Sequence, residues 1–572
     1  MPDTFPPELV NLVRQHAASD EYAAYCRNLL AELIDIDTRP KPDPAEMAAN
    51  EERIFAVIES ELRGLCGDEV TIERVPIDPA IADDANYSQP YYTVTPDRPE
   101  PLSAAQTYKN RHNLIALFKA DAPGQAGTPS VHNCHVDTVA GWIEPRSDGQ
   151  RVYGRGACDD KGQIALLLGQ IKLLNEIRNE LGLRFAQDRV YQFVIDEEMG
   201  GNGALSMARD PRFDGWQVVV YEITSNVPHP ANRGAMWYRC TMSAAGNPDV
   251  QPVEMWPFVV RALEDEGAQI KAESNHPLFR PDHVQTSHGI LGCYGDHPSA
   301  VNDHVAIKIE ARASANPERI AMRIAEILET ALAEYTRIYG DKTTEPDPVT
   351  GQPKVPQHYE LTFEPSGDAL GYRLDIYGKA GHMGAIAQCD CAITKAAFML
   401  VALMRVARNY PTVQAQGYLG DAPDMLDPIV LEGGQGFQPT HPMAQLRERL
   451  AAAARRGARQ YCDFRRMPYK DAMVEMTFDK LHNEAYASPP DGPAMQAFQA
   501  AFGALDLPWP EPAAWQVSCD ARLFALAGHD VVTFGPGELQ FAHSAEECID
   551  IRQIQQALAI AVLQTARLGG MG

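Results

Sequence analysis

Apolar side chains at three- and four-residue intervals open the chain. They predict a helix over residues 8–36, whose buried face is carried by Leu29, Leu30, Leu33 and Ile34. A second helical pattern covers residues 51–64. Six prolines then interrupt residues 76–101, and because proline lacks the backbone N–H that helices and sheets need, we expect an extended surface insertion there.

Short apolar runs alternate with helical patterns after this insertion. Four runs predict strands, at residues 113–118, 130–135, 190–195 and 218–221. A helix is expected between the second and third of them, at residues 163–178, and the end of the chain adds a strand at 530–534 and a helix that begins at Asp550. Strands separated by helices of this length are typical of an α/β fold with a mostly parallel sheet.

The middle of the chain has a different organisation and shows signs of an internal duplication. Two similar strand openings, at Tyr238 and Tyr372, are each followed by helix, strand, helix and strand patterns. In the first unit Asn316 and Pro317 start a helix as its cap and its first residue. A proline-rich loop at 340–357 follows. We therefore expect two tandem βαββαβ modules, 234–340 and 358–485, with chance similarity as the alternative.

This change of pattern predicts two domains. Residues 1–233 and 486–572 form the α/β domain, and residues 234–485 form an α+β domain inserted into it. The chain has 572 residues, of which 45% are hydrophobic and 22% charged, as expected for a folded multidomain protein.

Charge and cysteine content restrict the partners and the compartment. The chain holds 50 Lys and Arg against 77 Asp and Glu, a net charge of −27, which opposes binding to nucleic acid or to an anionic membrane. It has no run of 18 apolar residues and no basic and apolar segment typical of an export signal near Met1, so we expect neither membrane spanning nor export. Eleven cysteines without a C-x-x-C pair favour free thiols in the reducing cytoplasm.

Two motifs of the first half carry groups suited to metal binding. His135 and Asp137 lie two residues apart at the end of a predicted strand and face the same side, so Asp137 could orient His135 as a metal ligand. Glycines at 154 and 156 give half of a dinucleotide-binding pattern. Asp159 occupies the position of the third glycine and would repel a pyrophosphate, so a metal site explains this loop better.

Three further stretches carry acidic or imidazole groups. Glu197 and Glu198 leave an extended backbone on opposite sides, so one can bind metal while the other faces a substrate. Glu222 ends a predicted strand, and His543 lies in a glycine-turned loop after another strand. Taken singly, each of these groups could be a helix cap, a surface charge or a buried histidine, but five such coincidences in one chain are not expected.

Together these motifs resemble those of the di-zinc family that includes aminoacylase, carboxypeptidase G, acetylornithine deacetylase, succinyl-diaminopimelate desuccinylase and several dipeptidases. The order and approximate spacing match over about residues 110–225 and 370–550. The resemblance implies a zinc-hydrolase catalytic domain interrupted by a lid. It also implies a hydrolase that cleaves the amide or peptide bond of an N-acyl amino acid or a small peptide.

The resemblance also assigns roles by position. It implies that His135 and Glu222 bind one zinc ion, that Glu198 and His543 bind the other, and that Asp159 bridges the two. Asp137 then orients His135, and Glu197 is the general acid and base that activates a water shared by the ions. The same donor set would admit Co²⁺ or Mn²⁺ in place of zinc.

Two residues are implied to contact the substrate. His382, in the motif Gly378-Lys-Ala-Gly-His, matches a lid histidine that reaches the substrate oxyanion, often from a partner subunit. A duplicated lid would supply His382 within one chain and so favour a monomer, whereas a single lid would favour a homodimer. Arg522, in Ser518-Cys-Asp-Ala-Arg, matches an arginine that binds a substrate carboxylate, although the extra cysteine departs from the family pattern.

Two other functions remain open at this stage. A catalytically silent relative could use the fold for binding, although all the implied ligands and Glu197 are present. A di-metal phosphoesterase could use a similar donor set, although the acidic chain shows no phosphate-binding loop. Neither alternative is favoured by a motif of its own.

Overall fold

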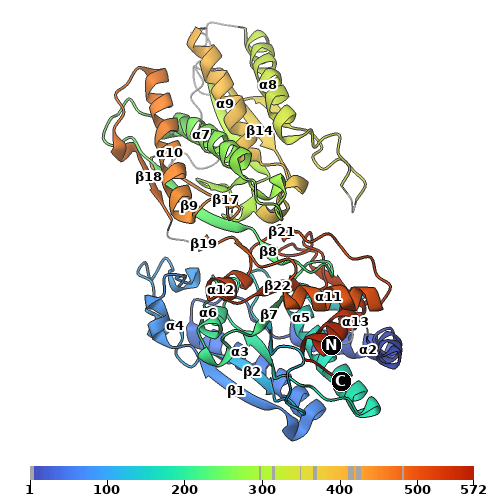
Figure 1. Cartoon of the computed structure of the whole chain (residues 1–572). Helices are drawn as coiled ribbons and strands as arrows, with labels where there is room; N and C mark the ends of the chain where they lie inside the picture. The colour runs from blue at the N-terminus through green and yellow to red at the C-terminus, as the bar shows by residue number, and fades with distance from the viewer. Residues whose placement is uncertain are drawn as a thin grey trace. The chain divides into compact units, whose positions relative to one another are not determined.

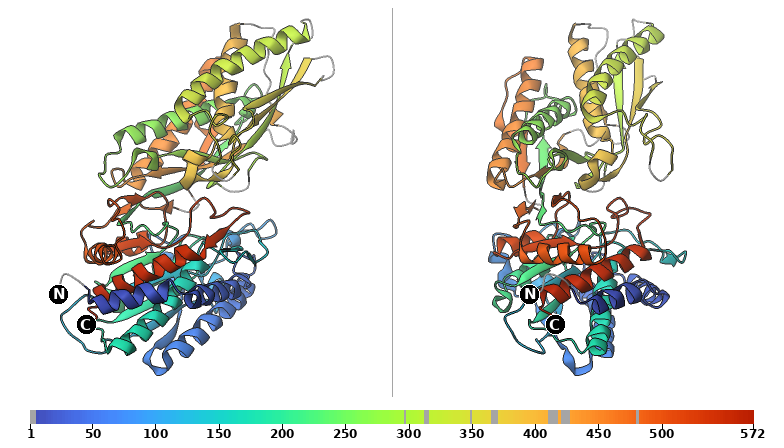
Figure 2. Two further views of the ribbon diagram at one scale, coloured as in Figure 1. Left: turned by 90° about the vertical axis from the view of Figure 1, so that its right-hand side faces the viewer. Right: turned by 45° about the vertical axis from the view of Figure 1, so that its right-hand side comes forward.

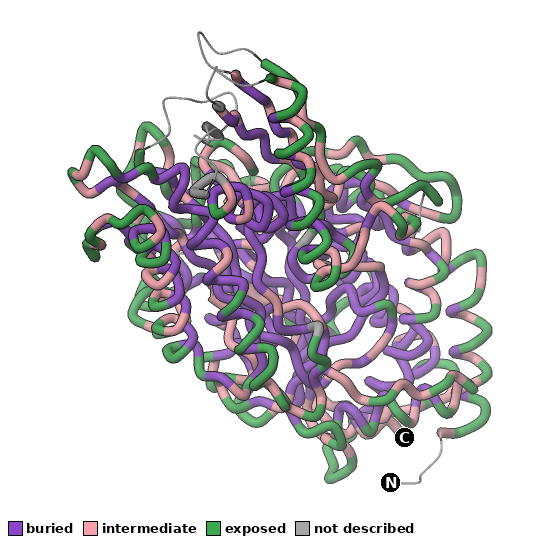
Figure 3. Tube along the Cα trace, turned by 90° about the horizontal axis from the view of Figure 1, so that it is seen from above, coloured by how far each residue is buried: buried purple, intermediate pink, exposed green. Residues whose placement is uncertain are grey.

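The computed structural model describes residues 5–295, 298–311, 316–347, 350–364, 370–409, 418–419, 427–478 and 482–572. The chain forms two compact units (Figure 1). Unit 1 consists of Met1–Gly234 and Leu481–Gly572, and unit 2 of Ala235–Lys480. Figure 3 colours the described residues by burial, with buried residues in purple and exposed residues in green. None of the helices in the described residues is both long enough and apolar enough to cross a membrane.

Unit 1 is built on a six-stranded sheet whose strand order is β1-β2-β6-β3-β7-β22. Its strands are β1 (Thr71–Pro76), β2 (His112–Phe118), β6 (Arg189–Val194), β3 (Ser130–His135), β7 (Gln217–Tyr221) and β22 (Val531–Phe534). The last four of these run parallel to one another, whereas β1 and β2 are antiparallel to their neighbours. The predicted α/β fold with a mostly parallel sheet is confirmed.

Helices cover this sheet and bury its central strands. They are α1 (Pro7–Ala17), α2 (Asp20–Ile34), α3 (Pro44–Cys66), α4 (Ala104–Thr107), α5 (Lys161–Leu181), α6 (Asn202–Ala208), α11 (Pro493–Ala504), α12 (Ala521–Leu526) and α13 (Ile551–Leu568). Helix α5 packs on β3 and contacts α1, α2, α3 and α13. The two ends of the chain meet in this layer, where the blue α1 lies beside the red α13 (Figure 2). Strands β3, β6, β7 and β22 are consequently buried along their whole length, polar residues of β3 and β6 included.

Two expectations for the N-terminal part are corrected. The helix predicted over 8–36 is two helices, because the chain leaves the helix at Ala18 and Ser19 and restarts with the Ser19 hydroxyl accepting from the Tyr22 N–H at 3.2 Å. Residues 76–101 are not only an extended surface insertion. They include short 3₁₀ turns at Pro79–Asp83 and Tyr91–Thr93, and Ser88, Tyr92 and Thr93 are buried.

Unit 2 contains two modules of the same topology. Module A consists of β9 (Gly234–Met242), α7 (Pro252–Glu273), β10 (Thr286–Leu291), β17 (Ile429–Phe437), α10 (Met443–Arg465) and β18 (Val474–Thr477), and its strand order is β10-β17-β9-β18. Module B consists of β12 (His304–Ala311), α8 (Pro317–Tyr339), β13 (Tyr359–Phe363), β14 (Leu370–Tyr377), α9 (Ala392–Asn409) and β16 (Tyr418–Leu419), and its order is β13-β14-β12-β16. Numbered along each module, both orders are 2-3-1-4, and in both modules the two helices pair (Figure 1).

The modules are nested rather than tandem, so the expected boundaries 234–340 and 358–485 are wrong. Module B is inserted between the second and third strands of module A, because β10 pairs with β17 and not with the nearer β12. Hydrogen bonding between strands depends on which edges meet in space, and the order of the patterns along the chain does not reveal it. A separate two-stranded pair joins β11 (Ala300–Val301), which precedes β12 in the sequence, with β15 (Gly381–His382), which follows β14.

Candidate metal centre

The carboxyl ends of the four parallel strands of unit 1 carry most of the predicted site residues. His135 is the last residue of β3, Glu197 and Glu198 follow β6, Glu222 follows β7, and His543 lies in the loop after β22. Asp159 comes from the loop before α5. Because parallel strands end at one edge of a sheet, residues far apart in the sequence meet there.

Asp159 faces two histidines with its two carboxylate oxygens. Its Oδ1 lies 3.1 Å from Nε2 of His135, and its Oδ2 lies 3.1 Å from Nε2 of His543. Each histidine has a second acidic neighbour, since Glu222 Oε1 is 3.9 Å from His135 Nε2 and Glu198 Oε1 is 3.1 Å from His543 Nε2. The donor atoms form two groups that share one aspartate.

Asp160 belongs to the first of these groups although no role was predicted for it. His135, Asp159, Asp160 and Glu222 have ligand atoms within 4.8 Å of one another, and so do Asp159, Glu198 and His543. The Asp160 carboxylate also accepts the backbone N–H of His135 at 3.2 Å. The motif Asp159-Asp160-Lys161 was visible in the sequence, but nothing in the pattern distinguished the second aspartate.

Asp137 contacts three parts of the site. The Nδ1 atom of His135 lies 3.0 Å from the Asp137 carbonyl oxygen and 3.5 Å from its carboxylate. The same carboxylate accepts the backbone N–H groups of Glu197 and Glu198, each at 3.1 Å. Asp137 therefore joins the β3 histidine to the turn that follows β6, and it directs Nε2 of His135 toward the acidic groups.

Charge is unevenly balanced in this cluster. Burial raises the pKa of Glu222 well above its ordinary value, and the charges of Asp160 and Asp159 raise it further. Burial also raises the pKa of Glu197, with Asp520 as the next contributor. Burial by itself lowers the pKa of His135, yet the carboxylates around the ring outweigh this effect and raise it. Within the described residues, Asp159, Glu198 and Glu222 have His135 and His543 as their ion-pair partners.

The turn that carries Glu197 and Glu198 is held from behind by a second buried cluster. Arg111, which has no exposed side-chain surface, donates to Asp196 through Nη1 at 3.1 Å and Nη2 at 2.5 Å, and to Glu51 through Nε at 3.0 and 3.1 Å. Tyr92, from the insertion, donates to Asp196 Oδ2 at 3.2 Å. The insertion also exchanges hydrogen bonds between Ser88 and Asn202, directly after the turn. Sequence reasoning missed this support, since neither Arg111 nor the insertion carried a motif.

The two residues predicted to contact the substrate, Arg522 and His382, lie in different units. Arg522 is 3% exposed, and it donates to Asn483 Oδ1 at 2.6 Å and to the Gly200 carbonyl at 2.8 Å, so part of its guanidinium braces the Glu197 turn. The backbone of His382 pairs with Ala300 in unit 2. The side chain of His382 lies outside the described residues.

The donor set fits divalent metal ions. Zinc bound to nitrogen and oxygen at roughly 2.0–2.2 Å in a tetrahedral site places neighbouring ligand atoms about 3.3–3.6 Å apart. The separations of 3.1 and 3.9 Å within the two groups lie around that value. Imidazole nitrogen and carboxylate oxygen are also the ligands that such ions take.

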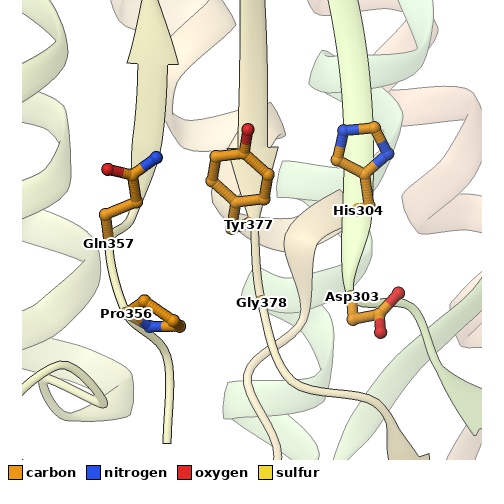
Figure 4. A pocket seen from close by; sticks show the side chains of 6 residues that line it. All are labelled: Asp303, His304, Pro356, Gln357, Tyr377 and Gly378. Carbon is orange, nitrogen blue, oxygen red and sulfur yellow. The ribbon is translucent and has the colours of Figure 1, made fainter. Parts of the chain in front are cut away.

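Unit 2 contains an open cavity of about 540 Å³, and in the described residues no cluster of three metal-binding side chains lies there. The cavity is lined by Asp303, His304, Pro356, Gln357, Tyr377 and Gly378 (Figure 4). The rings of His304 and Tyr377 stack with their centroids 5.6 Å apart, and His304 is already paired with Asp375 at 2.9 Å. In the described residues, metal-binding groups gather only in unit 1.

Comparison with known proteins identifies the family. The family model described as peptidase family M20/M25/M40 matches residues 131–564, which is most of the chain. The chain belongs to peptidase family M20/M25/M40. The family predicted from the motifs is thereby confirmed.

Two curated relatives of this M20 chain match over short segments. A peptidase M20 domain-containing protein of Schizosaccharomyces pombe is 31% identical over 127 residues, which cover 21% of this chain and 29% of the relative. A [LysW]-lysine/[LysW]-ornithine hydrolase of Sulfurisphaera tokodaii is 38% identical over 74 residues, or 13% of this chain and 19% of the relative. The matched segments thus span less than a third of either relative.

Two solved structures resemble the M20 chain over almost its full length. They are the dipeptidase Dug1p of Saccharomyces cerevisiae, with a TM-score of 0.54 at 13% identity, and human carnosine dipeptidase 1, with a TM-score of 0.50 at 12% identity. The first match covers 98% of both chains, and the second covers 98% of this chain and 99% of the other. At this identity the likeness concerns the fold.

Proposed function

We propose that this M20 chain hydrolyses the amide bond of a small peptide or an N-acyl amino acid, using two zinc ions held at the carboxyl edge of the unit 1 sheet. Unit 1 is then the catalytic domain and unit 2 the lid. His135, Glu222 and Asp159 hold one ion, and Asp159, Glu198 and His543 hold the other, with Asp160 beside the first. Co²⁺ or Mn²⁺ would fit the same donors.

One observation carries this proposal, namely the position of Asp159 between two histidines. Each of its oxygens points to a different imidazole at 3.1 Å, and each imidazole has a further carboxylate next to it. A carboxylate that spans two donor groups is suited to bridging two ions. The dipeptidases among the structural neighbours and the hydrolase among the curated relatives agree with amide chemistry.

Glu197 is the residue that moves protons. When bound, two divalent ions polarise a substrate carbonyl and lower the pKa of a water molecule toward 7. The Glu197 carboxylate takes a proton from the attacking water and returns it to the amide nitrogen as the carbon–nitrogen bond breaks. The products are a carboxylate and an amine. The Asp137 carboxylate accepts the backbone N–H of Glu197 and so fixes the backbone of that residue. The Glu197 carboxylate therefore keeps one position during both proton transfers.

His382 and Arg522 complete the proposal on the substrate side. The His382 side chain donates to the oxyanion that forms during attack, and because unit 2 holds two modules of one topology, we propose that a single chain supplies it and that the protein is a monomer. Arg522 is proposed to bind the substrate carboxylate with the donors that it does not use on Gly200 and Asn483.

Metal analysis combined with a substrate panel tests the proposal. Wild type, Glu197→Ala and the exposed-site control Glu546→Ala are assayed on dipeptides, N-acyl amino acids and phosphate esters, with metal content measured for each. We expect about two zinc ions per chain in all three proteins and amide hydrolysis in wild type and the control, with turnover in Glu197→Ala lower by roughly 10²–10⁴. Absence of metal after zinc loading would indicate a binding protein. Turnover of phosphate esters alone would indicate a phosphoesterase.

A further inference from the structure

Glu547 is a fully buried carboxylate that lies four residues after His543 and faces the loop of Asp159. Its Oε1 atom accepts three backbone N–H groups of that loop, from Gly156 at 3.0 Å, Asp159 at 3.2 Å and Cys158 at 3.3 Å. The side chain of Glu547 has no exposed surface. No motif had drawn attention to this residue.

The loop wraps around this single oxygen because its backbone is unusually free to turn. Gly156 has φ +88°, and a Cβ atom there would lie 2.8 Å from Thr138 Cγ2 and 3.0 Å from Lys161 Cδ. Only glycine combines this conformation with such a close approach. The three N–H groups of Gly156, Cys158 and Asp159 therefore depend on Glu547, and without it they would be buried without this acceptor.

The second carboxylate oxygen of Glu547 binds Arg155, which lies at the start of the same loop. This Oε2 atom accepts from Arg155 Nη1 at 2.6 Å, and the Arg155 Nε donates to the Gly141 carbonyl at 2.9 Å. The backbone adds a further link, since Gly154 N–H donates to the Glu547 carbonyl at 3.2 Å. The segment that carries His543 and the loop that carries Asp159 are thus joined through one side chain.

We infer that Glu547 is a positioning residue that sets the distance between Asp159 and His543, and through it the affinity of the second metal site. This inference rests on the proposed function. Asp159 and His543, two of the three ligands of the second site, lie on the segments that Glu547 joins, whereas the first site shares only Asp159 with them and takes His135 and Glu222 from the ends of β3 and β7. Loss of the Glu547 carboxylate therefore weakens the second site more than the first.

Metal titration of the metal-free protein tests this inference without reference to turnover. Co²⁺ binding to wild type, Glu547→Gln and Glu547→Ala is followed by calorimetry and by visible absorption, with the exposed neighbour variant Glu546→Gln as the matched control. We expect two binding events in wild type and the control. In Glu547→Ala, which removes the acceptor oxygen, one event should weaken by roughly 10- to 100-fold while the other stays within about threefold, and the cobalt spectrum of the weakened site should change. Glu547→Gln keeps an oxygen that can accept the three N–H groups but loses the charge that pairs with Arg155, so it should weaken the same event by a smaller factor.

Glu547→Gln keeps the size of the side chain, so it remains informative even where Glu547→Ala does not fold. Rescue of hydrolysis by Glu547→Gln at high metal concentration would further support positioning over a general structural role. Two results would overturn the inference: wild-type affinity at both sites, or an equal weakening of both sites. Failure of the wild-type protein to bind metal or to hydrolyse any amide would instead overturn the proposed function.

Discussion

Two buried clusters of charge lie on opposite sides of the turn at residues 196–201, and they are balanced in different ways. On one side Asp196 and Glu51 share the guanidinium of Arg111. On the other side Asp159, Glu198 and Glu222 face His135 and His543, and no lysine or arginine of the described chain forms an ion pair with these three carboxylates. Burial is similar in both places, but only the first cluster is compensated by a permanent cation.

This difference separates a structural cluster from a binding cluster. A buried charge is costly unless it is paired, so several buried carboxylates that share two imidazoles and have no Lys or Arg partner are suited to binding an external cation. The structural cluster of Arg111, Glu51 and Asp196 holds the turn at residues 196–201 in place. The binding cluster of Asp159, Glu198, Glu222, His135 and His543 includes Glu198 from that turn.

Metal removal should produce the largest change. Free zinc at about 1,000 times its Kd stabilises a folded protein by about 4 kcal/mol per site, so two sites should raise the free energy of unfolding by about 8 kcal/mol. Thermal and urea unfolding with zinc and with a chelator measure this difference. Asp159→Asn should lose most of the response, whereas an equal response in that variant would show that the metal binds elsewhere.

Loss of Arg111 should be the next largest effect, and it should not depend on metal. Arg111→Met leaves Glu51 and Asp196 buried without their cation, which costs about 3–5 kcal/mol in the free energy of unfolding. Urea unfolding of the metal-free variant measures it. The control is Arg74→Met, because Arg74 pairs with Glu52 and Glu59 at a partly exposed position and should cost less than about 1 kcal/mol. Similar losses in the two variants would contradict the contrast.

His132 and His135 lie on the same strand, β3, but their pKa values shift in opposite directions. His132 is buried between tyrosines, and burial lowers its pKa to about 3, whereas the carboxylates around His135 raise the pKa of that ring. Since the unfolded chain takes up the His132 proton below about pH 6.5, stability should fall with decreasing pH. Between pH 6.5 and 4 this residue should account for roughly 3 kcal/mol.

Urea unfolding of metal-free wild type and His132→Gln at several pH values isolates this contribution. The variant should be less stable at pH 7 because it loses ring packing, but its free energy of unfolding should decline less steeply toward pH 4. Parallel pH profiles would mean that His132 is not the group that titrates.

The parts of the fold that could be predicted are those with a local signal. The strand patterns at β3, β6, β7 and β22 and the cap and proline at Asn316 and Pro317 correspond to elements that the structure contains. The motifs also selected residues that meet at one edge of the sheet. Each of these features depends on a few neighbouring residues, and a periodic pattern or a short motif therefore records it.

The remainder depends on contacts between distant segments. The nested modules could not be seen because β10 pairs with β17 across the whole of module B. Neither Arg111 nor Glu547 belongs to a motif. The carboxylate partners of Arg111 lie 60 and 85 residues away in the sequence. The partners of Glu547 in the Asp159 loop lie 388 to 392 residues away. The proline count of residues 76–101 predicted irregular structure but could not show that Tyr92 reaches Asp196.

The smallest predicted effects have opposite signs and so test the contrast most directly. Both substitutions replace a buried carboxylate by an amide of the same size in metal-free protein. Asp196→Asn weakens charge-assisted hydrogen bonds from Arg111 and should destabilise by about 1.5–3 kcal/mol. Glu222→Gln should stabilise by about 1–2 kcal/mol at pH 8, because the raised pKa of Glu222 means that its ionisation costs stability as the pH rises above its unfolded value. At pH 4, where Glu222 is protonated in both states, the gain should vanish. Destabilisation by Glu222→Gln at pH 8 would show that the binding cluster is already balanced without metal, and the distinction between the two clusters would then fail.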